Sequence, residues 1–290
     1  MGPIRVTVRR GAVAEAVHRV HAVAVENGQV VEAAGDPMLL TFYRSSSKPI
    51  QALPLARERD DVTEEELAIA CASHRAQQQQ LDAAGRLLAR APATEADLEL
   101  GPQEGRGPSL LAHNCSGKHA GFLAVCRARG WPTEGYRLAS HPLQRLLLED
   151  VAACAELPPE EVATAIDGCG VLTFALTLER MAHSFSRLER LPGGDRIAAA
   201  MRAHPLLIGY EGANDTELMR RLPGWIAKSG AEGLLCAASS EGRGVALKVE
   251  DGNQRALPPA LASFLGLGDD FAVVRLENSH GESVGEIVVE

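Results

Sequence analysis

Both ends of this 290-residue chain have the sequence pattern of β-strands, and the section between them has the pattern of helices. Within residues 15–34, two apolar runs flank Asn27-Gly28, a pair that favours the positive φ angles of a tight hairpin turn. Four further β-rich runs lie towards the other end, at 233–238, 245–249, 271–276 and 284–289. We therefore expect one antiparallel sheet formed by N- and C-terminal strands.

The middle of the chain has apolar residues at helical spacing. We expect helices at 63–71, 76–91, 140–155, 159–166 and 173–188. These helices would pack on the sheet, which gives an α+β fold and not the strand-helix alternation of a doubly wound fold. We predict a single catalytic domain over 1–290, with a sheet lobe at about 1–44 and 220–290, a helical lobe at about 45–219, and linkers near 92–108 and 190–196.

Composition argues against several classes of protein. A net charge of −9 disfavours a nucleic-acid binder, because phosphate binding needs a basic face. No apolar run reaches the roughly eighteen residues of a membrane span, and the first residues lack the apolar core of a signal peptide. We therefore expect a cytoplasmic protein that binds neither membranes nor nucleic acids. The six cysteines show no Cys-x-x-Cys spacing, so we expect buried thiols and no disulfide framework.

The first chemical motif is Ser45-Ser-Ser-Lys48. If a helix begins here, Ser45 and Lys48 lie on one face, which places a nucleophile beside a base. A lysine acts as a base only when burial or a nearby cation lowers its pKa. The alternative is a serine N-cap followed by a solvated lysine. Pro49 fits a first helical turn, and Pro54 should end or kink the helix near Leu53.

A second motif, Lys228-Ser229-Gly230, lies just before the predicted strand at 233–238. Combined with an upstream Ser-x-x-Lys, such a triplet is typical of serine β-lactamases and penicillin-binding proteins. Its lysine adds positive charge and Gly230 lets a substrate approach the backbone; the alternative is a strand-opening turn. Ser73 lies between the two motifs and is a second candidate polar site residue. Its neighbour His74 is a candidate base or a structural histidine.

A third group consists of His113, Cys115, His119 and, further along, Cys169. Two cysteines in glycine-containing loops could bind a soft or borderline cation with a nearby histidine. Cys115 paired with His119 as a nucleophile is another interpretation, although a local Cys/His pair differs from the papain pattern. A third interpretation is that these cysteines are buried and chemically inert.

Together these motifs resemble the asparaginase II family of rhizobial type, the class 3 L-asparaginases. The resemblance rests on five segments in family order, Tyr-Arg-Ser-Ser-Ser-Lys-Pro-Ile-Gln-Ala-Leu-Pro at 43–54, Cys-Ala-Ser-His at 71–74, His-Asn-Cys-Ser-Gly-Lys-His-Ala-Gly at 113–121, Asp-Gly-Cys-Gly at 167–170 and Lys-Ser-Gly-Ala-Glu-Gly at 228–233. It implies a fold related to glutaminases and serine β-lactamases.

The resemblance implies two Ser–Lys tandems, Ser45 with Lys48 and Ser73 with Lys228. Lys248, in a neighbouring predicted strand, is the alternative to Lys228. Ser45 would attack the side-chain amide of L-asparagine after losing its proton through either tandem, and backbone N–H groups around it would stabilise the oxyanion. Either serine has a plausible lysine, so the choice of nucleophile stays open at this point.

The resemblance also implies binding sites. Cys115, Lys118 and Cys169 match the family's zinc site, in which a neutral lysine is a ligand and the metal supports substrate affinity more than bond cleavage. Arg44 and Asp167 are candidates for holding the substrate's α-carboxylate and α-amine by charge complementarity, or are structural. A homodimer, with exposed apolar helix faces as its interface, is expected as well.

The implied reaction releases L-aspartate and ammonia. The segments after Gln77 and at 99–108 are short, which leaves a preference for L-glutamine open. A β-lactamase or D,D-peptidase is the nearest other enzyme, but no Ser-Asp-Asn triplet occurs. A non-catalytic zinc- or amino-acid-binding protein is the alternative from a different class.

Overall fold

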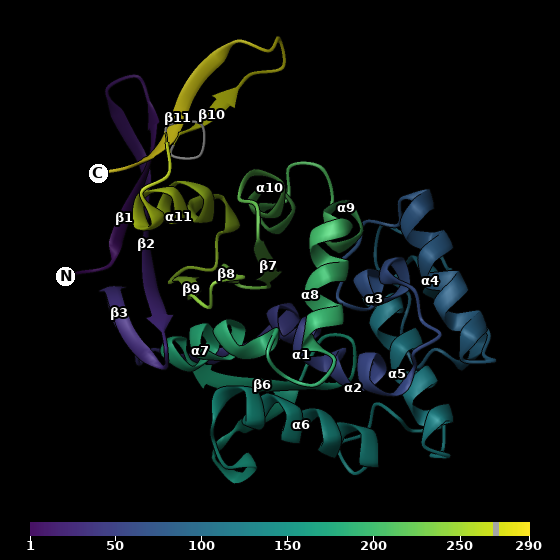
Figure 1. Ribbon diagram of the computed structural model, residues 1–290. Coiled ribbons are helices and arrows are strands. Elements are labelled where there is room, and N and C mark those ends of the chain that lie inside the picture. Colours follow the sequence, from purple (N-terminus) through teal and green to yellow (C-terminus); the bar gives the residue numbers. More distant parts are fainter. Residues whose placement is uncertain (269–272) are drawn as a thin grey trace.

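A single antiparallel sheet joins the N- and C-terminal parts of the chain (Figure 1). The computed structural model describes residues 1–268 and 273–290. Among them, eight strands form this sheet in the order β10-β11-β1-β2-β9-β8-β7, with β3 also paired to β2. The strands are β1 (Ile4–Arg10), β2 (Val13–Glu26), β3 (Gln29–Ala34), β7 (Trp225–Gly230), β8 (Leu234–Ser239), β9 (Gly244–Val249), β10 (Val274–Glu277) and β11 (Ser283–Val289). The predicted sheet is confirmed.

The hairpin predicted at Asn27-Gly28 is also confirmed. Both residues have positive φ, 49° and 77°, and they connect β2 to β3 at the pair Glu26 and Gln29. Of the strand predicted at 271–276, β10 contains the part from Val274 onward, and residues 271–272 lie outside the described residues.

Helices cover both faces of the sheet. In β2 every residue from Val20 to Val25 is buried, as expected when neither face meets water. Two helices supply the cover: α7 (Leu178–Leu188) packs on β2, β8 and β9, and α11 (Leu257–Leu265) packs on β1, β2, β9 and β11. Gly244 permits the close approach of α7, since a Cβ there would lie 2.0 Å from the Ala182 carbonyl oxygen.

The remaining helices form a layer beside β7, away from the terminal strands (Figure 1). They are α1 (Lys48–Gln51), α2 (Leu53–Glu58), α3 (Glu64–Ala70), α4 (Gln78–Arg90), α5 (Ser116–Ala128), α6 (Pro142–Ala155), α8 (Gly194–Ala203), α9 (Pro205–Ile208) and α10 (Asn214–Arg221). The break between α1 and α2 at Ala52 is the interruption that Pro54 predicts. Among the described residues, no helix has the length and apolar character needed to cross a membrane.

Two helix predictions in this region are wrong, one over its length and one in its first part, and a linker prediction is too long. A small sheet of β4 (Leu40–Phe42), β6 (Leu172–Thr177) and β5 (Ala163–Ile166) replaces the helix expected at 159–166 and the first part of the one expected at 173–188. Because β6 is buried almost throughout, its apolar run has no alternation that would distinguish it from a helix. Thr177 then caps α7 by accepting a hydrogen bond from the Arg180 N–H. The linker expected at 190–196 contains the start of α8 at Gly194.

Candidate active site

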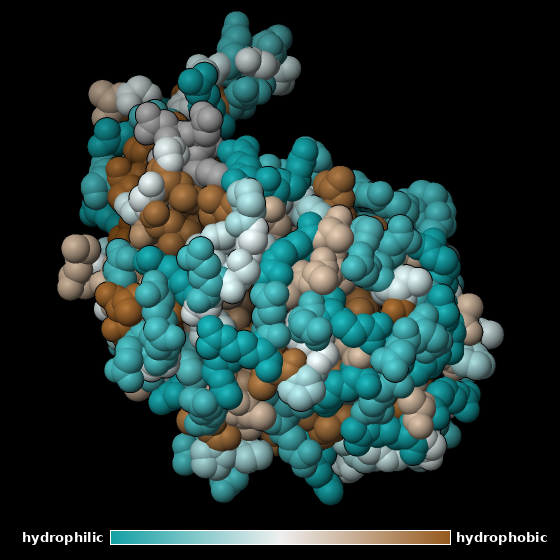
Figure 2. All heavy atoms as spheres, viewed as in Figure 1, coloured by the Kyte–Doolittle hydropathy of each residue, from teal (hydrophilic) through white to brown (hydrophobic). Residues whose placement is uncertain are grey.

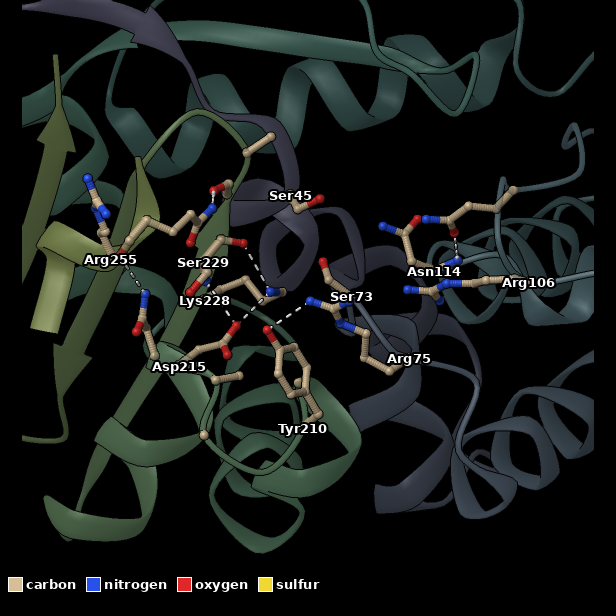
Figure 3. Close-up of a pocket in the computed structure, with 18 residues that line it drawn as sticks. Ser45, Ser73, Arg75, Arg106, Asn114, Tyr210, Asp215, Lys228, Ser229 and Arg255 are labelled. Carbon is tan, nitrogen blue, oxygen red and sulfur yellow. Dashed lines mark hydrogen bonds and ion pairs between the residues drawn. The ribbon is translucent and has the colours of Figure 1, made fainter. Parts of the chain in front are cut away.

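A cavity of about 580 Å³ lies between edge strand β7 and the helical layer. Figure 3 shows Ser45, Ser73 and Lys228 on its walls, and Gly230 lines it as well. Four residues that the sequence motifs selected, from segments up to 185 positions apart, therefore share one cavity. The fold brings them together because β7 packs against the turn that carries Ser45.

Ser45 lies in a short 3₁₀ helix, η1 (Arg44–Ser47), that follows β4 and leads into α1. Arg44 has a φ of +50°, so the chain turns sharply immediately before Ser45. The next residue ties this turn to β7, since the Ser46 hydroxyl donates to the Lys228 carbonyl oxygen at 2.8 Å. Ser45 thus stands in a first helical turn, in which the Arg44 N–H donates to Thr173 Oγ1 and the Ser46 N–H to the Tyr43 carbonyl oxygen.

Lys48 pairs with Ser73, and not with Ser45 as the motif spacing suggests. Its side chain is buried, and Nζ donates to the Ala72 carbonyl oxygen at 2.5 Å, to Ser73 Oγ at 3.1 Å and to the Asn114 carbonyl oxygen at 3.3 Å. The side chain points toward the segment after α3 because Lys48 is the first residue of α1, beyond the 3₁₀ turn that holds Ser45. Burial lowers the pKa of Lys48, which favours its neutral, basic form.

Lys228 forms a buried ion pair instead of the expected pair with Ser73. Its Nζ lies 2.7 Å from Asp215 Oδ2, and the same oxygen accepts the Ser229 N–H at 3.0 Å. Burial alone would raise the pKa of Asp215, but Lys228 and the backbone N–H donors outweigh it, so the pKa is lowered. Lys248, the alternative to Lys228, donates to the Val249 carbonyl oxygen and does not line the cavity.

The Lys-Ser-Gly triplet forms the last three residues of strand β7. The alternative interpretation, in which it is a turn that opens the next strand, is wrong. A Cβ on Gly230 would lie 2.9 Å from both the Tyr43 carbonyl oxygen and Ser46 Oγ, so only glycine allows β7 to approach η1 this closely. The buried Ser229 hydroxyl has no hydrogen-bond partner among the described residues, and it borders the cavity. The end of β7 therefore presents one unsatisfied polar group to a ligand.

Arg44 and Asp167 contact each other. Arg44 Nε donates to Asp167 Oδ1 at 2.7 Å, and neither residue is part of the described cavity wall. Their predicted contact with substrate requires this pair to open, and it stays a prediction.

Cys115, Lys118 and Cys169 converge at the start of α5, and all three are buried. Lys118 Nζ lies 3.1 Å from Cys169 Sγ, and a hydrogen bond to Cys169 lowers the pKa of the Cys115 thiol. Among the described residues, no three His, Cys, Asp or Glu side chains form a metal-binding group, so a metal ion held here would need Lys118 as its third donor.

The histidines of this region make structural contacts. His119 Nδ1 is 2.7 Å from the Tyr136 hydroxyl, His113 Nδ1 accepts the Cys115 N–H at 3.0 Å, and His74 Nε2 is 2.9 Å from Ser116 Oγ. Burial lowers the pKa of His74 to about 3, so this ring is neutral. The interpretation of Cys115 and His119 as a catalytic pair gains no support from these contacts.

Sequence reasoning missed several cavity residues, namely Asp215, Arg75, Arg106, Asn114 and Tyr210. They come from loops and from the start of α10; Asn114 lies within the motif at 113–121, whose cysteines and lysine drew the prediction, and no motif contains the other four. For Asp215 the only available signal was a buried lysine in the motif, which requires a carboxylate partner.

Comparison with known families identifies the chain. The model of the family described as L-asparaginase II matches residues 6–288. The chain belongs to the L-asparaginase II family. A search of curated protein sequences gives no significant match.

Solved structures agree with this family assignment at the level of fold. Mglu in its native form aligns with a TM-score of 0.51 and 15% identity, over 86% of this chain and 65% of the Mglu chain. Mglu in its L-glutamate binding form aligns with a TM-score of 0.51 and 14% identity, over 93% and 65% of the two chains. The L-asparaginase II family member described here thus shares the α+β fold of Mglu.

Proposed function

We propose that this protein hydrolyses the side-chain amide of L-asparagine and releases L-aspartate and ammonia. Family membership and fold support a serine-type amidohydrolase. The observation that carries the proposal is the 3.1 Å contact between Lys48 Nζ and Ser73 Oγ at a cavity that Ser45 also lines. A buried lysine in contact with one serine hydroxyl, at a cavity that a second serine lines, supplies the base and the nucleophile that acyl transfer by a serine requires.

Lys48 is the base in this proposal because burial lowers its pKa. In the neutral amine the Ser73 hydroxyl donates to the lone pair of Nζ, and the two N–H groups donate to the Ala72 and Asn114 carbonyl oxygens. Lys228 lines the cavity as an ion pair with the Asp215 carboxylate and holds the end of β7 in place. Ser73, in direct contact with Lys48, passes the proton between the nucleophile and the base.

Ser45 is the nucleophile. Its Oγ attacks the side-chain amide carbon while its proton moves through Ser73 to Lys48. The C–N bond then breaks, and the same proton leaves with ammonia. Water then attacks the β-aspartyl ester and gives a proton to Lys48. That proton returns through Ser73 to Ser45 Oγ as the ester C–O bond breaks, which restores Ser45 and frees L-aspartate. Figure 3 shows both serine side chains on the cavity side of the backbone, in keeping with this division of roles.

We also propose that Cys115, Lys118 and Cys169 hold zinc. Two thiolates and a lysine amine, which must lose its proton when the metal binds, are donors that suit this ion, and the three side chains already converge without a disulfide. Zinc would fix the start of α5 against the turn that contains Cys169, and so support the nearby cavity wall. Replacing either cysteine by serine should remove bound zinc, as measured by elemental analysis of the purified protein.

A homodimer in the cytoplasm is the proposed state of the enzyme. Figure 2 shows apolar side chains gathered over α11 below the β10–β11 hairpin, where Pro258, Leu261 and Val274 line an apolar groove of about 250 Å³. Six free buried thiols suit a reducing compartment. Sedimentation would measure the oligomeric state, and cell fractionation the location.

L-Glutamine is the second candidate substrate. The chain shares its fold with Mglu, which has an L-glutamate binding form, and the cavity has room for another methylene group. The test is ammonia release from L-asparagine, L-glutamine and, in parallel, ring opening of a chromogenic β-lactam. Release from L-asparagine that Ser45→Ala abolishes supports the proposal. If Ser45→Ala and Ser73→Ala both keep full activity, the serine mechanism is wrong. A folded, zinc-supplied protein that acts on neither amide has another function.

A further inference from the structure

The cavity wall carries more positive than negative charge. Arg75, Arg106, Arg255 and Lys228 line it, and Asp215 is the one acid among its described residues. Asp215 is already paired with Lys228. None of the three arginine guanidinium groups has a carboxylate within ion-pair distance among the described residues. Most arginines elsewhere in the chain pair with an acid, so this exception occurs at the reaction site of an otherwise acidic protein.

Arg75 is held in place on the side of the cavity that carries Ser73. Its Nη2 donates to the Tyr210 hydroxyl at 2.9 Å, and its guanidinium lies 4.4 Å from the centre of the Tyr210 ring. Gln80 fixes the backbone on both sides, since its Oε1 accepts the Arg75 N–H at 3.0 Å and its Nε2 donates to the Gly209 carbonyl oxygen at 2.6 Å. A fixed guanidinium loses less entropy when it binds a ligand.

Arg106 lies close to Arg75. Its Nη1 donates to the His74 carbonyl oxygen at 2.6 Å and to the Ala112 carbonyl oxygen at 3.2 Å, and its other N–H groups have no acceptor among the described residues. Burial and the positive charge of Arg75 both lower the pKa of Arg106. Two like charges held together without an acid are stabilised by an anion between them.

We propose that Arg75 and Arg106 bind the α-carboxylate of the amino-acid substrate. This inference rests on the proposed function, and it assigns the carboxylate to a pair other than Arg44 and Asp167, which neutralise each other. Planar guanidinium groups match a carboxylate by paired hydrogen bonds. Arg255 lies across the cavity beside β7, where its Nε donates to His18 Nε2 at 3.0 Å, and serves as the comparison (Figure 3).

The test compares substrates with and without the α-carboxylate. Ammonia release is measured for L-asparagine and for L-aspartic diamide, in which the α-carboxylate is an amide. Arg75→Leu and Arg106→Leu should each lower kcat/KM for L-asparagine by roughly 10- to 100-fold, mainly through KM, and change the diamide reaction by less than about threefold. Arg75→Lys should lie between, because it keeps the charge and loses the planar fork.

Two control variants separate this role from general loss of positive charge. Arg255→Leu, within the cavity, and Arg145→Leu, on the exposed surface of α6, should affect both substrates equally and little. Equal losses on both substrates in the Arg75 and Arg106 variants would overturn the inference. A carboxylate-specific loss in Arg44→Leu or Arg255→Leu, but not in Arg75→Leu, would overturn it as well.

Ligand binding tests the site independently of turnover. Calorimetry with the wild-type protein should show that L-aspartate binds and that L-isoasparagine, with an α-carboxamide, binds at least roughly tenfold more weakly. If the protein releases no ammonia but keeps this preference, the proposed function fails and the carboxylate site stands. Equal binding of both compounds, or no binding of either, overturns the site.

Discussion

In the proposed mechanism the chemistry depends on Lys48. Methionine has a similar length and cannot accept a proton, so Lys48→Met should lower kcat by roughly 10²- to 10⁴-fold while the fold persists. Because the pKa of Lys48 is lowered, the neutral amine is present at a lower pH than for an ordinary lysine, whose pKa is about 10.4. Wild-type activity should therefore rise as pH increases through the pKa of Lys48, and Lys48→Met should lack this rise. A Lys48→Met profile with the same rise would assign it to another group.

Asp215 and Lys228 form a buried pair whose members need each other. Asp215→Ala leaves Lys228 buried without a counter-ion and should lower the free energy of unfolding by about 3–5 kcal/mol. Replacing both, as Asp215→Leu with Lys228→Met, should recover much of that loss, because no charge then remains buried. Urea denaturation measures both variants. An Asp215→Ala variant as stable as the wild type would contradict the role of this pair.

At the residue scale, sequence motifs located Ser45, Ser73 and Lys228 at one cavity but could not give their partners. The Ser-x-x-Lys spacing suggested that Lys48 contacts Ser45, whereas the change from a 3₁₀ turn to α1 directs Lys48 to Ser73. The role of Asp215 could not be predicted from the sequence, because its partner Lys228 lies on β7, which contacts α10 only in the folded chain.

The approach of β7 to η1 depends on Gly230. A methyl group there would meet the Tyr43 carbonyl oxygen and Ser46 Oγ at 2.9 Å, so Gly230→Ala must displace the strand. We expect a loss of about 1–3 kcal/mol in stability and a lower kcat/KM, measured by denaturation and ammonia release. Gly101→Ala is the matched control, because a Cβ at that exposed position meets no atom within 4 Å. Equal behaviour of the two variants would show that β7 tolerates the shift.

Among the elements, amphipathic helices and the Asn27-Gly28 hairpin were predictable because their patterns are local. The strand β6 was not, since burial on both faces removes the alternation that identifies a strand. Within 173–188 the chain changes from β6 to α7 at the N-cap residue Thr177. That boundary could not be predicted, because Thr177 acts as a cap only once the residues before it are paired as a strand.

For the whole molecule, the contrast between an acidic surface and a positively charged cavity has a measurable effect. L-Aspartate carries one net negative charge and L-asparagine none, so salt should act mainly on the product. The inhibition constant for L-aspartate should rise several-fold between about 0.01 M and about 1 M NaCl, as the Debye length falls from about 30 Å to about 3 Å. The KM for L-asparagine should change less. If both constants rise equally, net ligand charge does not govern entry to the cavity.

At this largest scale the sheet and helix layers were predictable from the distribution of patterns along the chain, and the family from its ordered motifs. The cavity charge was not, because Arg75 and Arg106 come from two separate loops and Arg255 from a short 3₁₀ helix, Gln254–Ala256. Pattern analysis gave each of them no more meaning than any other surface arginine.

The pairing of β1 with β11 governs how this chain can acquire its structure. Val6 lies opposite Val289, so residues 283 positions apart must meet before the sheet has its final neighbours. During synthesis β1 and β2 emerge long before β11, and until then one edge of β1 remains open to other chains. Such distant closure slows folding, because the entropy lost on closing the loop must be met before the contacts form. Until residues 283–289 leave the ribosome, that edge of β1 is therefore a site at which growing chains can pair with one another.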